Sequence, residues 1–532
     1  MKRIGNWLLV LAVAASTAGA EDLAGKKLAY APGADLGDAE LRIQDGSIHL
    51  TLEEAIGLAV ERNLGIEVER YSVEQAHLGI QQAMGIYDLG LSAGLSVSSS
   101  TSPSASNLQG ADVQEQKARG FDIGLSQLTP TGGTAGLSFD ASRFETNNSF
   151  YSINPSFSSN FGLSFGQPLL NGFGRATTEY RIATARGQSA QAKENFLVTV
   201  DTTVQQVING YWTLLEAQEQ LKVAEEGLAL AKQLHEMNRV RVDVGTLAPL
   251  ELVQSEAGVA TREEEIIRAH AAIGDAEDQM RALLHLEGDQ AWSMPIAADT
   301  DPRTDRVDAD LQTSLHDALA QRPELAAQRE VQKNLELGAA FAAQDLKPRL
   351  DLLAKYGSTG VGGDVIVRDP DTGEVLQVLP GGLSDAFKQV RKFDFTGWSV
   401  GLQFAYPLQN RAARARKTTA DLAVDQGATR VRQLEQQVST EVRTAVRGLD
   451  TAQKQIESAA VSRRLEERNL EAEQKKYENG LSTSFQVLSI QDDLTAAKSR
   501  EVTAITGYRR ALAEYWRATG KLLESSGIQL EE

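Results

Sequence analysis

The same order of segments occurs twice in this chain of 532 residues. Each copy has a short helix, then β-stretches in which apolar residues alternate with Gly and Ser, then two very long helices. Leu78-Gly79 aligns with Leu337-Gly338, and the alignment continues without a gap through Leu91 and Leu350. A repeat of this length far exceeds the ~20 to 50 residues of a solenoid unit. It therefore indicates a duplication that gave two similar halves.

The first residues have the pattern of a secretory signal peptide, which we assign to 1–20. Lys2 and Arg3 precede an apolar run, and Ala18-Gly19-Ala20 supplies a small-residue cleavage site. The chain has no Cys, which excludes disulfides, thiol catalysis and thiolate metal sites. The formal charge of −19 makes the chain a poor candidate for binding nucleic acid, whose phosphates would repel it, and we expect no nucleic-acid partner.

Two helical hairpins are predicted, at 176–287 and 412–524. Both are rich in Ala, Glu, Gln, Arg and Leu. At ~1.5 Å per residue, their longer helices reach roughly 100 Å, wider than a globular domain. Apolar residues such as Leu214, Leu221 and Leu228 recur every seven residues, the sum of a three- and a four-residue spacing, which indicates a seam packed on neighbouring helices. This periodicity leaves open an ordinary antiparallel coiled coil.

The β-stretches, 88–168 and 348–407, favour a membrane barrel over a soluble sheet. Large apolar residues such as Leu95 and Phe161 alternate with Gly and Ser. Because successive residues of a strand face opposite sides, one face is apolar and the other small and nearly uncharged. Such faces suit lipid outside and a wet lumen inside. A barrel in hydrocarbon must close, and one chain has too few strands, so we expect an obligate oligomer.

Two insertions interrupt this plan. In the first half, a turn at 129–133 adds a hairpin, which either extends the barrel strands and loops or enlarges the barrel; we favour the extension. In the second half, the Gly-rich segment 357–392 contains a predicted hairpin around Asp369 to Gly373, which we place outside the cell.

Several segments resemble the TolC-like outer-membrane efflux proteins. Leu50 to Ala55 with Asn63-Leu64 is similar to the opening helix of that family, and Tyr211 to Leu215 to its long-helix signature. Gly245 and Gly480 lie where the family turns its helical hairpins. The resemblance covers roughly residues 50 to 524.

The resemblance implies an α+β fold: a trimeric membrane β-barrel of about 12 strands, continued by a long periplasmic antiparallel α-helical barrel and built from two tandem repeats. It implies a homotrimer in outer-membrane lipid, extending into the periplasm. The tip would dock a periplasmic adaptor, or membrane fusion protein, tied to an inner-membrane pump. The chain would be the exit duct of a tripartite efflux or type I secretion system. The chain would then have six segments in order. They are a signal peptide (1–20), an N-terminal linker (21–48), the first repeat (49–288), an equatorial linker (289–312), the second repeat (313–524) and a tail (525–532).

The resemblance also implies a gate near the hairpin turns. Tyr477 matches a gate tyrosine, and Glu251 falls on the carboxylate position that such a tyrosine contacts. The gate arginine of the family falls on Ser482, and its lumen carboxylates fall on Gln486 and Ser489. The remaining gate candidates, Asp492 and Asp493, lie one turn further along. We expect a gate with fewer salt links and weak block by divalent cations.

Adaptor docking is expected at the turns themselves. The residues are Gly245, Thr246, Leu247, Gly480 and Leu481. The glycines permit a left-handed turn, and an exposed Leu is unusual at a solvated tip. The alternatives are that each Gly only ends its helix, that Tyr477 is an ordinary seam aromatic, and that Glu251 is a first-turn carboxylate.

No enzyme is predicted. Two G-x-S-x-G matches, Gly90 to Gly94 and Gly162 to Gly166, lie inside strand alternation, whereas a hydrolase needs this motif at a strand-to-helix turn. The 6 His have no metal-binding spacing, and we expect no metal or cofactor. The alternative function is a soluble periplasmic coiled-coil adaptor or scaffold protein. The sequence does not choose among drug, metal and protein cargo.

Overall fold

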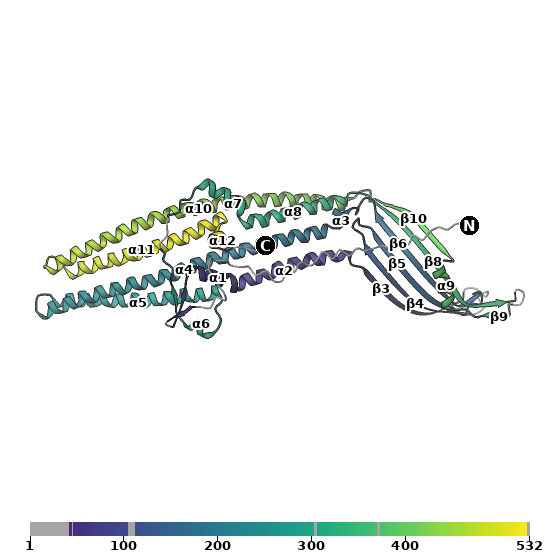
Figure 1. Ribbon diagram of the computed structural model, residues 1–532, viewed down its shortest axis with the longest axis horizontal. Coiled ribbons are helices and arrows are strands. Elements are labelled where there is room, and N and C mark those ends of the chain that lie inside the picture. Colours follow the sequence, from purple (N-terminus) through teal and green to yellow (C-terminus); the bar gives the residue numbers. More distant parts are fainter. Residues whose placement is uncertain (1–41, 45, 105–111, 303–305, 370–372, 529–532) are drawn as a thin grey trace. The chain divides into compact units, whose positions relative to one another are not determined.

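The computed structural model describes residues 42–528, apart from residue 45 and the segments 105–111, 303–305 and 370–372. The predicted signal peptide and most of the predicted N-terminal linker lie outside the described residues. The chain divides into two compact units (Figure 1). Of the described residues, the first comprises those from Arg42 to Glu74, Phe196–Arg322 and those from Val438 to Ile528, and the second comprises Gln75–Asn195 and Pro323–Gln437.

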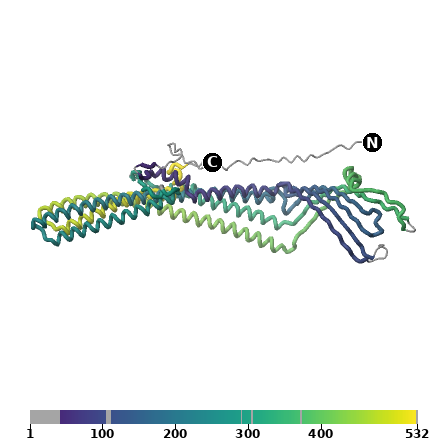
Figure 2. The backbone as a smooth tube through the Cα atoms, turned by 90° about the horizontal axis from the view of Figure 1, so that it is seen from below, coloured from purple at the N-terminus to yellow at the C-terminus, as the bar shows by residue number. Residues whose placement is uncertain are grey.

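Two antiparallel helical hairpins dominate the first unit. α4 (Tyr180–Asp243) and α10 (Arg411–Glu478) begin in the second unit and end in the first, where they turn back as α5 (Pro249–Leu284) and α11 (Ser484–Thr519). Figures 1 and 2 show the two hairpins side by side as far as their turns. The four long helices predicted from the sequence are therefore present.

Local sequence signals set the ends of these helices. Pro249 occupies the first turn of α5, where its missing N–H costs nothing. The Thr483 side chain caps α11 by accepting from the backbone N–H of Gln486. Gly520, with φ of 76°, ends α11 in the left-handed conformation.

Shorter elements complete the helical part of the chain. α1 (Leu52–Arg62) begins with a capping box in which Thr51 and Glu54 satisfy each other's backbone N–H groups. The others are α2 (Leu64–Met84), a 3-10 helix (Gly85–Tyr87), α3 (Arg175–Thr178), α6 (Asp289–Ser293), α7 (Leu311–Gln321), α8 (Pro323–Gln344) and α12 (Leu522–Ser525). None of the helices in the described part of the chain is both long and apolar enough to span a bilayer.

A small sheet joins the N-terminal region to the segment between the repeats. β2 (Ser47–Leu50) pairs antiparallel with β1 (Arg42–Gln44) and parallel with β7 (Ile296–Ala298). These strands were not predicted, because they are too short to show a period of two. The pairing makes the segments that flank the first repeat part of one folded layer.

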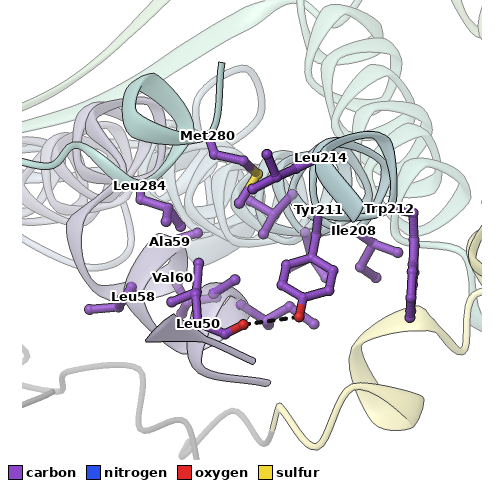
Figure 3. Close-up of a cluster of buried hydrophobic side chains, with 14 of the residues drawn as sticks. Leu50, Leu58, Ala59, Val60, Ile208, Tyr211, Trp212, Leu214, Met280 and Leu284 are labelled. Atoms are coloured by element: carbon purple, nitrogen blue, oxygen red, sulfur yellow. Dashed lines mark hydrogen bonds between the residues drawn. The ribbon is translucent and has the colours of Figure 1, made fainter. Parts of the chain in front are cut away.

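The main core of the first unit packs this sheet and α1 against α4 and α5. Tyr211 and Trp212 of α4 and Met280 of α5 are fully buried in it (Figure 3). The Tyr211 hydroxyl donates to the Leu50 carbonyl at 2.9 Å and accepts from the Thr300 N–H at 3.0 Å. One tyrosine thus ties the long helix to both chain segments of the small sheet.

The second unit is built on one large antiparallel sheet with the order β10-β8-β6-β5-β4-β3. Its strands are β3 (Gly90–Pro103), β4 (Val113–Leu128), β5 (Thr134–Thr146), β6 (Ile153–Pro168), β8 (Arg349–Arg368) and β10 (Thr396–Ala405). The additional hairpin of the first half is β4–β5. It lies in the middle of the sheet, in continuous register with β3 and β6, so its interpretation as a mere extension of strands and loops was wrong.

The turn of this additional hairpin is anchored to the connection that follows β6. The Thr131 hydroxyl donates to the Gln167 side chain at 2.8 Å, and the Gly174 N–H donates to the Thr131 carbonyl at 3.0 Å. A Cβ at Gly132, whose φ is +88°, would overlap the Gly172 carbonyl. The hairpin is therefore a packed part of the sheet.

The register confirms that the sheet has two different faces. Leu91, Leu125, Leu137, Leu163, Tyr356 and Trp398 stand opposite one another across all six strands and define the apolar face. Leu95 and Trp398 on this face are 90% and 78% exposed. The neighbouring row of the sheet, which includes Ser92, Gly124 and Ser138, points to the opposite side and belongs to the small-residue face.

The insertion in the second half forms a hairpin followed by a helix. β9 (Val375–Leu379) pairs with the end of β8, as predicted for the residues around Val365 and Val375. The helix α9 (Leu383–Lys392), which was not predicted, lies beside β8 at the end of the sheet away from α3 (Figure 1). It packs on the apolar face, where Phe387 meets Phe139 with ring centroids 5.9 Å apart.

Replacement of Tyr211 by Phe is expected to destabilise the first unit by about 1–3 kcal/mol, because it removes the partner of the Thr300 N–H and one of the two hydrogen bonds that the Leu50 carbonyl accepts. The measurement is the denaturant dependence of protease resistance of the purified protein. Tyr71→Phe is the matched control, since Tyr71 is 59% exposed and its hydroxyl donates to Glu67 on the same helix. Equal stability of the two variants would contradict the assignment.

Candidate functional site at the hairpin tips

Both helical hairpins turn through the same backbone motif. Gly245 and Gly480 have φ of 75° and 74°, the left-handed region that glycine adopts without strain. The N–H groups of Gly245 and Thr246 each donate at 2.9 Å, to carbonyls three and five residues earlier. Gly480 and Leu481 repeat the pattern at 3.0 and 2.9 Å. This Schellman arrangement satisfies the last carbonyls of α4 and α10, so each Gly ends its helix and also sets the turn.

Tyr477 of α10 lies in the seam between the two hairpins and is only 2% exposed. Its ring belongs to a buried cluster with Leu234 of α4 and Val487 of α11. Its hydroxyl donates to the side-chain oxygen of Asn238 on α4 and lies 3.5 Å from the Ser484 hydroxyl. Tyr477 is therefore a seam aromatic whose polar end links α10 to the other hairpin.

Arg241 of α4 completes this link, and the sequence analysis missed it. Its guanidinium lies 4.7 Å from the centroid of the Tyr477 ring. It also donates to the carbonyls of Tyr477 and Glu478 at 3.1 and 3.2 Å. These carbonyls stand at the C-terminal end of α10, where the helix dipole favours a cation. A basic residue in the last turn of α4 was the available sequence signal, but it does not reveal a contact across the hairpins.

Glu251 reaches Tyr477 only through other residues. The Ser484 hydroxyl donates to the Glu251 carboxylate, and the Asn238 amide lies 3.5 Å from the Glu251 carbonyl. The resemblance implied a direct contact between the carboxylate and the tyrosine. In the structure, the buried hydroxyl of Ser484 stands between them. The carboxylate is still joined to the partner hairpin, through α11.

The four remaining gate candidates on α11 have different surroundings. Gln486 and Asp493 are exposed, and Ser489 is half-buried. Asp492 forms an ion pair with Arg262 of α5, whose side chain is 8% exposed and also lies 2.7 Å from Glu265. The Asp492 carboxylate is thus paired with a cation that the sequence analysis did not identify.

The second turn holds one more carboxylate. The Ser482 hydroxyl donates to Glu473, and the Lys476 ammonium lies 2.9 Å from the other oxygen of this carboxylate. The hydrogen bond and the ammonium hold the pKa of Glu473 below its usual value. Because the folded-state pKa is lowered, these contacts stabilise the turn above the usual carboxyl range and are lost as the pH falls through the lowered pKa.

The end of the hairpins is more apolar than predicted. Leu481 is 78% exposed, as expected, but Leu247 is half-buried. Three further exposed apolar residues lie close to the turns in sequence: Val244, Leu250 and Phe485. We name Val244, Leu250, Leu481 and Phe485 the tip residues. The sequence analysis missed three of them, because a helical pattern does not show which apolar residues remain outside the seam.

The chain belongs to the outer membrane efflux protein family. The model of that family matches residues 55–285 and 314–521, which are the two repeats. No protein with curated annotation matches the chain by sequence. The protein is accordingly an outer-membrane efflux channel that extends into the periplasm, and not an enzyme.

Solved structures of outer-membrane channels share the fold at low sequence identity. The CmeC channel of Campylobacter jejuni is 15% identical, with 90% of each chain covered and a TM-score of 0.64. VceC of Vibrio cholerae is 15% identical, with 88% of this chain and 96% of that chain covered and a TM-score of 0.63. The open state of the MtrE channel of Neisseria gonorrhoeae is 15% identical, with 88% and 89% covered and a TM-score of 0.53.

These matches confirm the predicted fold class of barrel strands continued by long periplasmic helices in two tandem repeats. They also favour the channel over the soluble coiled-coil scaffold. Within the described residues, no group of three or more Asp, Glu or His side chains is arranged to hold a metal ion. The contacts at the tip are hydrogen bonds, ion pairs and a cation–π contact, beside exposed apolar side chains.

Proposed function

We propose that three copies of this chain assemble into one continuous channel, which receives substrates from an inner-membrane pump and releases them outside the cell. A periplasmic adaptor, or membrane fusion protein, docks on the tip residues. The hydrogen bonds around Tyr477 hold the periplasmic end closed. The pump sets the cargo.

The observation that carries the assembly is the pair of sheet edges. Among the described strands, β3 and β10 stand at the two ends of the large sheet. In hydrocarbon, each unpaired backbone group costs several kcal/mol, so both edges need partners. The six strands alternate in direction, which makes β3 and β10 antiparallel. The β3 edge of one copy therefore suits the β10 edge of the next.

The strand count supports a wider barrel than the resemblance implied. Each chain supplies six strands along the main path of the sheet, so three copies supply 18 instead of about 12. Barrels of about 16 to 18 strands leave an aqueous channel. The additional hairpin β4–β5 accounts for the whole difference.

The gate is supported by the contacts that join the two hairpins of one copy. Asn238 and Arg241 of α4 both engage Tyr477, and Glu251 of α5 engages Ser484. Opening an iris of hairpins requires such contacts to break. Asp492 is paired with Arg262, and Gln486 and Ser489 are uncharged, so Asp493 is the remaining exposed carboxylate among these positions. We therefore expect only weak binding of divalent cations near the tip.

Adaptor docking is supported by the exposure of the tip residues. Leu481 and Phe485 are 78% and 66% exposed at the end of a hairpin that is otherwise rich in charge. Apolar side chains that gather on an exposed tip mark a surface for another protein. The proposed docking site is therefore the tip residues together with Gly245, Thr246 and Gly480.

The assembly is tested by disulfide cross-linking between β3 and β10, which is specific because the chain has no Cys. A scan pairing Leu91→Cys or Leu95→Cys with Val400→Cys should give covalent dimers and trimers in outer membranes after oxidation. Pairing Leu95→Cys with Leu137→Cys is the control, because β5 lies inside the sheet and cannot reach another copy. Products that end at dimers would overturn the trimer, and electron microscopy of the cross-linked species gives the strand count.

The gate is tested by planar-bilayer conductance of Arg241→Gln and Tyr477→Phe. Each variant loses at least one hydrogen bond of the seam, and a bond to a charged group is worth about 1.5–3 kcal/mol. The open fraction should therefore rise roughly tenfold or more for Arg241→Gln. Lys475→Gln is the control, because Lys475 pairs with Glu471 on its own helix at 2.7 Å. Unchanged conductance of both variants, or strong block of the open wild-type channel by divalent cations, would contradict the proposed gate.

Docking is tested by the double substitution Leu481→Asp with Phe485→Asp. Transport should be abolished in cells that depend on this channel, while trimers in the outer membrane stay at the wild-type level. The matched control is Leu481→Ile with Phe485→Leu, which keeps the tip apolar and should transport normally. Loss of the trimer in the Asp variant would show that these side chains are structural.

A further inference from the structure

The apolar face of the large sheet carries two arginines directly opposite each other. Arg119 of β4 pairs in register with Arg143 of β5, so their side chains point to the same side as Phe121 and Phe139. Like charges at opposite positions of neighbouring strands destabilise a sheet. On a face that meets lipid, a cation is tolerated near the interface but costs about 2–4 kcal/mol at the midplane. These arginines therefore need an interface and more negative charge than the Glu145 carboxylate, 2.8 Å from Arg143, supplies.

Their position in the sheet supplies the interface. The row in register is Val97, Arg119, Arg143, Phe157 and Gly362. It lies toward the end of the sheet away from the attachment of α4, α8 and α10. Because those helices are periplasmic, this end is extracellular, and the row lies at the outer-leaflet boundary of the membrane. Below it toward the periplasm, the face is apolar.

The helix α9 builds a wall beside this row. It lies so close to β8 that a Cβ at Gly360 or Gly362 would overlap the backbone carbonyl of Ala386 or Gly382. The Gln389 side chain bonds both the N–H and the carbonyl of Val361, each at 3.0 Å. α9 is therefore fixed on the lipid side of the barrel.

The outward side of α9 is amphipathic. Phe387 is 49% exposed, and Lys388 has an exposed side chain that pairs with Asp385 at 3.2 Å. Arg391 and Lys392 are exposed as well. An apolar and basic surface of this kind suits the boundary between acyl chains and anionic headgroups.

Between α9 and the strands β3 to β6 lies a groove of about 330 Å³. Its apolar floor includes Leu95, Val97 and Phe157, and Leu383 of α9 closes one side. Arg119 and Arg143 both line it. Arg143 is partly engaged, since it lies 2.8 Å from Glu145 and 6.0 Å from the centre of the Phe157 ring. Arg119 is exposed beside it.

We propose that this groove binds a phosphate-bearing lipid of the outer leaflet. An acyl chain lies along Leu95, Val97 and Leu383, and the phosphate bridges Arg119 and Arg143. The anion relieves the repulsion between the two guanidinium groups, which offer the forked donors that phosphate binds best. The occupant is a lipid rather than free phosphate, because the groove is apolar below the arginines and continuous with the membrane-facing surface. The inference rests on the apolar face being outside the barrel and does not depend on the gate or the adaptor.

The test uses the purified, delipidated full-length channel and native mass spectrometry. Three probes separate the possible ligands: dimyristoyl phosphatidic acid, dimyristoylglycerol with the same chains but no phosphate, and inorganic phosphate as a competitor. Phosphatidic acid should bind to each copy at least about tenfold more tightly than dimyristoylglycerol, because hydrogen bonds to charged groups are the strong ones. Excess inorganic phosphate should displace it only weakly.

Two sets of variants locate the site. Arg119→Gln with Arg143→Gln should weaken phosphatidic acid binding at least about tenfold, and Leu383→Gln should weaken it by spoiling the apolar wall. Arg349→Gln is the matched control, because Arg349 is an exposed arginine of the same sheet at its periplasmic end, paired with Asp351 at 3.2 Å. Cross-linked trimers and channel conductance should be unchanged in all of these variants, which separates this proposal from the proposed function.

Three results would overturn the proposal. Equal binding of phosphatidic acid and dimyristoylglycerol would show that the phosphate does not contribute to binding. Full displacement by inorganic phosphate would mean that the arginines hold a free anion instead of a lipid. Undiminished binding by both the arginine and the Leu383 variants, in correctly assembled channels, would place the lipid elsewhere.

Discussion

The pairing of backbone groups in hydrocarbon is the constraint on which the rest of this structure depends. Water is absent there, so every N–H and C=O of the large sheet must bond to a neighbouring strand. Within the described chain, β3 and β10 end the sheet, and each of their outer edges requires another copy. The oligomer, the lumen and the membrane-facing surface all follow from this requirement. The width of the channel then depends on how many strands each copy contributes.

Duplication has preserved backbone geometry more strictly than side chains. Gly245 and Gly480 end their helices with nearly the same φ and the same pair of hydrogen bonds. The residues that follow differ, since Thr246 is polar and Leu481 apolar. The two hairpins therefore turn alike but present different surfaces. The second repeat supplies Tyr477 to the seam. The first repeat supplies Asn238, which accepts a hydrogen bond from the Tyr477 hydroxyl, and Arg241, whose guanidinium lies over the Tyr477 ring.

The large sheet uses its two faces for different tasks. Small residues such as Gly124 and Ser138 leave room in the lumen, whereas the apolar face meets lipid. The paired arginines, the neighbouring charges of Lys117 and Glu145, and α9 all depart from the apolar pattern, and they occur together at one end of the sheet. Because they lie close together, one explanation covers them all, namely that this end of the sheet lies in the headgroup region of the membrane. None of them would be stable at the centre of the bilayer.

The sequence by itself determined the duplication, the long helices, the alternating strands and the glycine turns. The duplication appears as residues that align without a gap, the helices and strands as local periods, and the turns as glycines at positions that need a positive φ. The alternation of large apolar residues such as Leu95 and Phe121 with small residues was enough to predict a membrane barrel. Only the tertiary structure decided the place of β4–β5 within the sheet, because alternation shows that a strand exists but not which strand it pairs with. It likewise decided that Asn238 and Arg241 meet Tyr477, that Arg262 neutralises Asp492 and that Leu247 is half-buried. Those contacts join residues far apart in the chain, and no local pattern records which of them the packing of two hairpins brings together.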